Sequence, residues 1–114
     1  MARPGSSVEF VETDRFTKNR ERLVTDDELR QFQLELIADP TAGDVIRGAG
    51  GFRKVRIATR RRGRRASARV IYFLVTRSDQ ILLYDIYEKS EEDSLSKEER
   101  NELKTVSQYL KSDT

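Results

Sequence analysis

The sequence predicts a single α+β domain in which helices pack on one face of an antiparallel sheet. Its 114 residues are close to the usual length of one domain. Residues 25–38 and 96–111 repeat apolar side chains at helical intervals, whereas residues 52–87 hold three runs rich in β-branched and aromatic residues. With a short strand and helix ahead of them, the predicted order is a strand, two helices, a meander of three antiparallel strands and a helix.

The start of the chain is expected to contribute one strand and one helix. Residues 1–7 include Pro, Gly and two Ser, and we expect them to form a flexible terminus. A short strand begins at Val8 and joins the sheet late. Thr13 or Asp14 can then cap a helix over Arg15–Leu23.

The second helix has the clearest start signal. Thr25-Asp26-Asp27-Glu28 has the spacing of a capping box, in which the first and last side chains satisfy backbone N–H groups. Asp39-Pro40 ends the helix, because proline pushes the preceding residue out of the helical region. The predicted span is Thr25–Ala38. Its apolar stripe consists of Leu29, Phe32, Leu36 and Ile37.

A strand with a cationic face is predicted after the second helix. Glycines break regular structure over residues 41–51, and Phe52–Thr59 then alternates apolar with basic residues. Val55 points to one face of this strand, while Lys54 and Arg56 point to the other.

Two further strands complete the predicted meander. The run Arg60–Arg65, with Gly63 as its flexible point, is interpreted as the hairpin loop. Ala68–Thr76 is apolar on both faces, so we expect it to be the central strand. Ser78-Asp79 forms a turn before the last strand, Gln80–Tyr87.

The final helix repeats the capping-box signal. Ser96-Lys97-Glu98-Glu99 opens it after an acidic loop. Leu103, Val106 and Leu110 form one apolar stripe, and we expect the helix to end near Lys111.

Composition excludes several kinds of site. The chain has no Cys and no His, so we expect neither a disulfide framework nor a zinc site, and no cofactor. The longest apolar run, Val70–Val75, is too short to span a bilayer, and residues 1–7 lack the apolar stretch of a signal peptide. A cytoplasmic location without a membrane partner is expected.

Charge is sharply divided along the chain. Between Val45 and Ser78 there are eleven Lys or Arg and no Asp or Glu, whereas the other residues carry 11 Lys or Arg against 20 Asp or Glu, a net charge of −9. A merely solvated surface normally intersperses both signs. The division therefore favours a polyanionic partner such as a nucleic acid.

Three motifs, in order, resemble the HigB branch of the RelE/ParE superfamily of type II toxin-antitoxin toxins. Gly48–Arg56 resembles the glycine-rich lead into a basic strand, and Arg69–Tyr72 resembles the second strand. Ile86–Lys89 followed by Asp93–Leu95 resembles the end of the last strand. This chain has Ala66-Ser67 where the family often has two glycines.

The resemblance implies a single RelE-like toxin domain over residues 1–114. The activity it implies is that of a metal-independent, ribosome-dependent mRNA endonuclease, which inhibits translation by 2'-OH-mediated cleavage of A-site mRNA. The implied partners are a cognate antitoxin, of the small helix-turn-helix kind, and the ribosome with its rRNA and mRNA. DNA would be contacted only through the antitoxin complex.

Such cleavage needs a proton acceptor, a cation near the phosphorane and a proton donor for the leaving oxygen. Lys54 is the candidate acceptor, because neighbouring positive charges disfavour its protonated form. Arg56 and Arg69 can clamp phosphate oxygens with forked guanidinium groups. Tyr87 can stack on an mRNA base or orient the substrate, and Lys89 can protonate the leaving oxygen.

Docking on the RNA backbone is assigned to a larger set of arginines. These are Arg53, Arg60, Arg61, Arg62, Arg64 and Arg65. Two alternatives stay open, since the same fold serves ParE-like inhibitors of DNA gyrase and since charge alone is compatible with a noncatalytic RNA-binding module.

Overall fold

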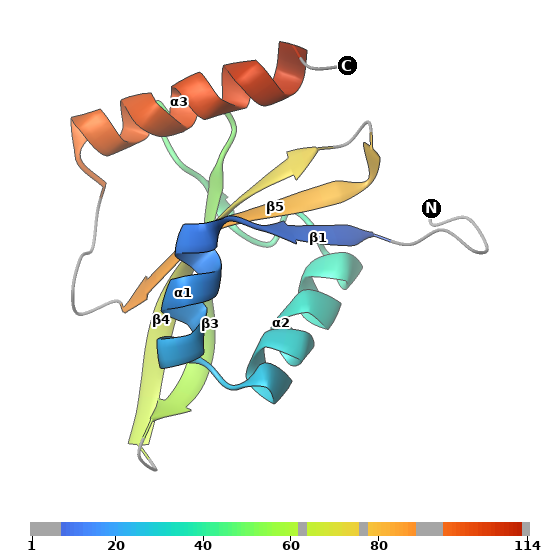
Figure 1. Cartoon of the computed structure of the whole chain (residues 1–114), viewed down its shortest axis with the longest axis vertical. Coiled ribbons are helices and arrows are strands. Elements are labelled where there is room, and N and C mark those ends of the chain that lie inside the picture. The colour runs from blue at the N-terminus through green and yellow to red at the C-terminus, as the bar shows by residue number, and fades with distance from the viewer. Residues whose placement is uncertain (1–7, 62–63, 76–77, 89–94, 113–114) are drawn as a thin grey trace.

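The helices and the longer strands follow one another in the predicted order (Figure 1). The computed structural model describes residues 8–61, 64–75, 78–88 and 95–112, so the predicted flexible terminus lies outside the described residues. In chain order the elements are β1 (Glu9–Glu12), α1 (Asp14–Leu23), α2 (Asp26–Ala38), β2 (Asp44–Val45), β3 (Arg53–Arg61), β4 (Arg64–Val75), β5 (Gln80–Glu88) and α3 (Lys97–Ser112).

The strands form one sheet in the order β1-β5-β4-β3-β2. The predicted antiparallel meander of β3, β4 and β5 is confirmed, and β4 lies at its centre. β1 pairs in parallel with β5, and the two-residue β2, which was not predicted, pairs with the start of β3. Ala66 and Ser67 keep regular pairing with Thr59 and Ala58, so the hairpin does not need the family's glycines.

The prediction that the helices pack on one face of the sheet is wrong. α1 and α2 cover one face, where Phe16 lies in the same buried cluster as Tyr72. α3 covers the other face, where Leu103 lies in the same cluster as Phe52 and Phe73. β4 serves both cores because successive side chains of a strand point to opposite faces.

The three helices begin where their sequence signals predict. Of the two candidate caps of α1, Thr13 is the N-cap, and its hydroxyl accepts a hydrogen bond from the backbone N–H of the first helical turn. Thr25 and Glu28 exchange both hydrogen bonds of the capping box at α2. Ser96 and Glu99 do the same at α3.

The prediction that Ile37 belongs to the apolar stripe of α2 is wrong. Ile37 is 43% exposed, whereas Leu29, Phe32 and Leu36 are buried against the sheet. Ile37 follows Leu36 directly and therefore lies about 100° further round the helix.

Within the described ranges, no helix has the length and apolar content needed to cross a membrane.

The predicted hairpin loop Arg60–Arg65 is also corrected, because most of it is strand. β3 continues through Arg61, and β4 begins opposite it at Arg64. Residues 62–63 lie outside the described residues. The prediction took Gly63 as the flexible point of a loop, but strand pairing is made by backbone groups and extends to Arg61 and Arg64 on either side of it.

Glu28 secures the extended part of this hairpin. Its Oε1 accepts hydrogen bonds from the backbone N–H of Thr25 and from Thr59 Oγ1 at 2.7 Å. Its Oε2 accepts from the backbone N–H of Arg60 at 2.9 Å. The residue that completes the capping box of α2 therefore also pairs with the outer edge of β3.

Candidate nucleic-acid interface

Four of the five predicted catalytic residues lie on one face of three adjacent strands. Arg56 is opposite Arg69, and Arg69 is opposite Tyr87, which makes one row across β3, β4 and β5. Lys54 lies two residues before Arg56 on the same face of β3. We call Lys54, Arg56, Arg69 and Tyr87 the strand-face cluster.

Arginine faces arginine repeatedly along the β3–β4 hairpin. Directly opposite residues have Cβ atoms about 4.5–5.5 Å apart, and like charges at that separation destabilise the pair. Among the residues that the structure describes, neither Arg56 nor Arg69 forms an ion pair. Such an arrangement costs stability unless an anion neutralises it. Arg56 and Arg69 form such a pair, and the backbone register also places Arg60 opposite Arg65 and Arg61 opposite Arg64.

The structure does not bring Arg53 to the strand-face cluster. Alternation along β3 places it on the face opposite to Lys54, next to the α1 and α2 core. There its Nη1 donates a hydrogen bond to the Gly43 carbonyl at 2.7 Å and a longer one to the Thr41 carbonyl. In this position the Arg53 guanidinium holds the segment that leads into β2.

The other predicted docking residues lie toward the end of the hairpin. Arg60 is exposed and shares the face of Arg56. Arg62 of the docking set and Lys89 of the catalytic set lie outside the described residues. The other three members of the docking set, Arg61, Arg64 and Arg65, lie in the paired ends of β3 and β4.

Tyr87 is more enclosed than its predicted stacking role requires. The residue is 9% exposed and belongs to the buried cluster on the α3 side, together with Ile71 and Leu95. A base could stack on this ring only after neighbouring side chains moved aside. In the described structure the ring instead anchors the end of β5.

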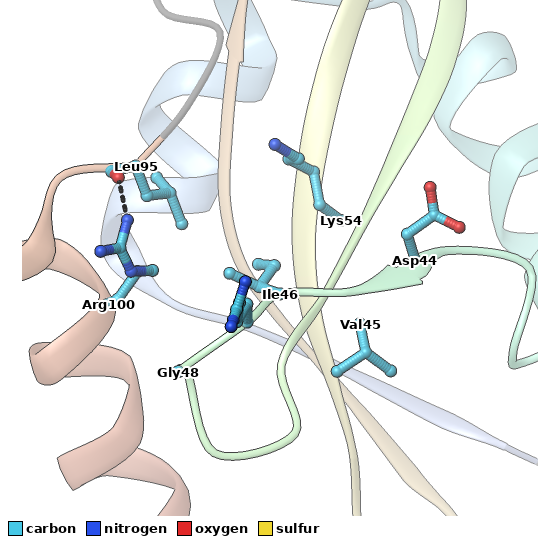
Figure 2. Close-up of a pocket in the computed structure, with 8 residues that line it drawn as sticks. Asp44, Val45, Ile46, Gly48, Lys54, Leu95 and Arg100 are labelled. Carbon is cyan, nitrogen blue, oxygen red and sulfur yellow. Dashed lines mark hydrogen bonds between the residues drawn. The ribbon is translucent and has the colours of Figure 1, made fainter.

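A pocket of about 610 Å³ opens beside Lys54. It lies between β2, the glycine-rich segment that follows it, β3 and the start of α3. Figure 2 shows Leu95 and Arg100 across the pocket from Asp44. Three cations and one carboxylate contribute to its walls. The lining residues are Asp44, Val45, Ile46, Arg47, Gly48, Lys54, Leu95 and Arg100.

Arg47 and Arg100 line the pocket but were not among the predicted site residues, although Arg47 belongs to the basic segment between Val45 and Ser78. Arg47 lies among glycines, which indicated a turn rather than a site. Arg100 is far from the basic segment in sequence, next to Glu98 and Glu99 in the first turns of α3. One feature of the sequence could have identified Arg100: it lies near the predicted start of a helix, where the helix dipole disfavours cations.

A separate polar group joins β5 to α1 and α3. Burial raises the pKa of the Asp85 carboxyl above its ordinary value, although a hydrogen bond from Asn19 and the charge of Arg15 oppose the change. Burial, together with a hydrogen bond to Glu102, raises the pKa of Tyr84 to about 12. Tyr84 is therefore neutral at physiological pH and donates to the Glu102 carboxylate across the sheet–helix boundary.

Comparison with known proteins adds one finding about the fold. No protein-family model matches the chain. A free-state, double arginine-to-alanine mutant of the E. coli toxin RelE aligns with a TM-score of 0.56 and 14% identity, over 76% of this chain and 88% of that chain. The chain has the RelE fold. The intact E. coli RelBE toxin-antitoxin complex aligns with a TM-score of 0.53 and 15% identity, over 72% of this chain and 96% of the matched one.

The predicted α+β class with RelE-like element order is thereby confirmed. In this RelE fold the strand-face cluster lies on the central strands, on the side of the sheet that α3 covers. A fold at this level of identity does not choose between chemistries, so the function must be argued from the residues of the site.

Proposed function

We propose that the protein is the toxin of a type II toxin-antitoxin system, of the HigB kind, and that it is a ribosome-dependent mRNA endonuclease. The observation that carries the proposal is the facing pair Arg56 and Arg69 beside Lys54. Two forked guanidinium groups with no carboxylate partner among the described residues suit the non-bridging oxygens of one phosphate. The RelE fold supports the same assignment.

In the proposed reaction the 2'-oxygen of one nucleotide attacks the adjacent phosphorus, and the bond to the 5'-oxygen of the next nucleotide breaks. Lys54 takes the proton of the 2'-hydroxyl, while Arg56 and Arg69 stabilise the additional negative charge of the phosphorane. Lys89 gives a proton to the leaving 5'-oxygen, and Tyr87 orients the strand once neighbouring side chains have moved aside. These side chains supply each proton transfer, so the scheme needs no metal ion. The products are a 2',3'-cyclic phosphate and a 5'-hydroxyl.

The proposed partners follow from the same assignment. A cognate antitoxin would neutralise the toxin, as the E. coli RelBE complex pairs a toxin with an antitoxin. The basic end of the hairpin, Arg60–Arg65, would dock on rRNA backbone when the protein enters the ribosomal A site.

Expression in bacteria tests the site assignment. The wild type should arrest growth and cut mRNA within translated codons, whereas the double variant Lys54→Ala with Arg69→Ala should lose at least about 100-fold of the cleavage. Arg30→Ala is the matched control, because Arg30 is exposed on α2 and remote from the cluster. Undiminished cleavage by the double variant would contradict the assignment.

The same experiment separates the alternative functions. A DNA-damage response without mRNA cleavage would identify a gyrase-directed toxin. Purified protein that binds RNA but leaves mRNA intact on translating ribosomes would be a noncatalytic RNA-binding module. Either result would replace the proposed function.

A further inference from the structure

We propose that the pocket of Figure 2 is a nucleotide-binding subsite, in which Arg47 and Arg100 bind the phosphate of the nucleotide next to the one held by Arg56 and Arg69. The occupant is one ribonucleotide unit of a single RNA strand. Its phosphate meets the cations, and its base meets the apolar part of the lining. This inference rests on the proposed function for the identity of the strand as RNA.

The size and lining of the pocket fit a nucleotide better than a bare phosphate. Its volume of about 610 Å³ lies within the roughly 300–1,000 Å³ range of small-molecule sites. Ile46 and Leu95 are buried and form apolar parts of the wall. Val45 is 59% exposed although it lies in a strand, and it extends this apolar surface to the rim.

Arg100 is held ready to bind an anion. Its Nη1 donates a hydrogen bond to the Leu95 carbonyl at 2.6 Å, which fixes the guanidinium at the pocket wall. A guanidinium carries five N–H donors, so this bond leaves most of them available to a ligand.

The glycine-rich segment keeps the two walls of the pocket together. Gly48, with φ of +76°, lies against the stem of Arg100. Gly50, with φ of +70°, approaches α3 so closely that a Cβ there would lie 2.0 Å from Ser107 Oγ. Because glycine tolerates these angles and this approach, the segment that carries Arg47 is fixed against α3.

Lys54 connects the pocket with the strand-face cluster. It lines the pocket and lies two residues from Arg56 on the same face of β3, a spacing of about 7 Å along a strand. One RNA strand can therefore pass from the arginine row into the pocket.

Asp44 favours RNA over an acidic peptide as the occupant. The amino and imino groups of nucleic-acid bases can donate hydrogen bonds to a carboxylate in this position. The side chains of an acidic peptide offer only further carboxylates, which Asp44 would repel.

Binding by the purified full-length protein tests the subsite without requiring cleavage. The probe is a fluorescein-labelled RNA hexanucleotide with 2'-O-methyl groups, measured by fluorescence anisotropy at fixed salt. We expect Arg100→Ala and Arg47→Ala each to raise Kd by about ten-fold. Lys97→Ala, which removes an exposed cation from the same end of α3, should change Kd by less than about two-fold.

A second measurement uses the wild type alone. Titration with cytidine 3',5'-bisphosphate should shift the NMR amide signals of residues 45–48 and 95–100. Equal Kd values for Arg100→Ala and Lys97→Ala, or an absence of shifts in both segments, would overturn the subsite. If Arg100→Ala loses affinity for a polyglutamate peptide but binds RNA as the wild type does, the pocket is a protein-docking site and the nucleotide subsite is wrong.

Cleavage of ribosome-bound mRNA by the same preparation distinguishes the two proposals. If the wild type cleaves mRNA and Arg100→Ala binds the hexanucleotide as tightly as the wild type, only the subsite is wrong. If the wild type does not cleave but Arg100→Ala weakens RNA binding, the nuclease assignment fails and the nucleotide subsite stands.

Discussion

Arg56 and Arg69 lie opposite each other on neighbouring strands, where two like charges lower the stability of the sheet. No carboxylate among the described residues compensates them. In the proposed site the cations stay available to a phosphate, so the folded protein would bear this cost until the ligand binds. Arginine also offers the forked donors that a lysine lacks.

Arg56→Glu tests the cost of placing two arginines opposite each other. The new carboxylate would lie opposite Arg69, and opposite charges on adjacent strands contribute about 0.2–1 kcal/mol, so the free energy of unfolding should rise by roughly that amount. RNA affinity should fall by about ten-fold because a phosphate contact becomes repulsive. Urea denaturation and anisotropy measure the two effects. Arg30→Glu on α2 is the control, and equal effects from both variants would contradict the argument.

Asp85→Asn tests the effect of burying the Asp85 carboxyl on stability. Burial raises the pKa of Asp85 in the folded protein, so the contribution of this group to stability is greatest below the ordinary carboxyl value of 3.8 and falls as pH rises through the folded-state pKa. Asparagine keeps an oxygen that can accept from Asn19 and removes the titration. The variant should therefore unfold at a higher temperature than the wild type at pH 7, with a smaller difference at pH 3.5. Calorimetry at the two pH values decides, and a variant less stable at pH 7 would refute the prediction.

Residues near the starts of two helices contribute to parts of the structure outside those helices. Glu28 completes the capping box of α2 and also accepts the backbone N–H of Arg60 at the edge of β3. Arg100, near the start of α3, lines the pocket beside β3. Helix ends therefore position both the extended hairpin and the pocket.

Glu28→Ala tests the link between α2 and the hairpin. Losing the cap and the two contacts to β3 should lower the free energy of unfolding by about 1–2 kcal/mol at pH 7. Burial opposes the shift, but hydrogen bonds from Thr59, Thr25 and Arg60 lower the pKa of Glu28 below 4.5. Its contribution is therefore present above pH 4.5 and is lost as pH falls through the folded-state pKa.

Denaturation of Glu28→Ala and wild type between pH 2 and pH 7 provides the measurement. The difference between them should shrink as the pH falls. Glu35→Ala, at an exposed position of the same helix, should stay within about 0.5 kcal/mol of the wild type. A difference for Glu28→Ala that is constant with pH would exclude the charged carboxylate as its cause.

Gly50→Ala tests the packing of the glycine-rich segment on α3. The new Cβ would lie 2.0 Å from Ser107 Oγ and 3.1 Å from Lys104 Cα, at a φ of +70°. The clash and the strained angle together should cost about 2–4 kcal/mol. Gly48→Ala is the matched control, because its Cβ has ordinary contacts and only the angle costs, about 1–2 kcal/mol. Equal losses in urea denaturation would show that α3 does not press on Gly50.

The sheet lies between two hydrophobic cores. Basic and acidic residues are concentrated in different parts of the chain. Side chains of β4 enter both cores, so the sheet couples α3 to α1 and α2. The basic segment between Val45 and Ser78 supplies β3, β4 and part of the pocket, while acidic residues predominate in the rest of the chain. This division would direct the proposed polyanionic partner to the sheet and pocket.

Salt dependence of RNA binding tests this division. For a single-stranded oligonucleotide, log Kd should rise with log salt concentration by about 0.7 for each phosphate contact, so Arg69→Ala should reduce the slope by about that amount. Glu21→Gln on α1 removes a charge from the acidic part of the chain and should leave the slope unchanged. Anisotropy titrations across a salt series would contradict the division if both variants behaved alike.

Local sequence was sufficient to determine the helices, the meander and the charge of the site. Capping boxes and apolar periodicity act between residues a few positions apart, so Thr25 with Glu28 and Ser96 with Glu99 were predicted from sequence and are confirmed. The cationic face of β3 followed from simple alternation, which depends only on strand geometry. The chemical roles of its residues stay predictions.

Tertiary structure alone decided which distant residues meet. The placement of helices on both faces of the sheet, the pairing of Arg56 with Arg69 and the enclosure of Tyr87 depend on strand register and on which core each helix joins. Arg100 reaches the pocket only because α3 packs on the glycine-rich segment. These contacts join residues far apart in the chain, and their formation depends on packing of the whole domain, which local periodicity does not encode.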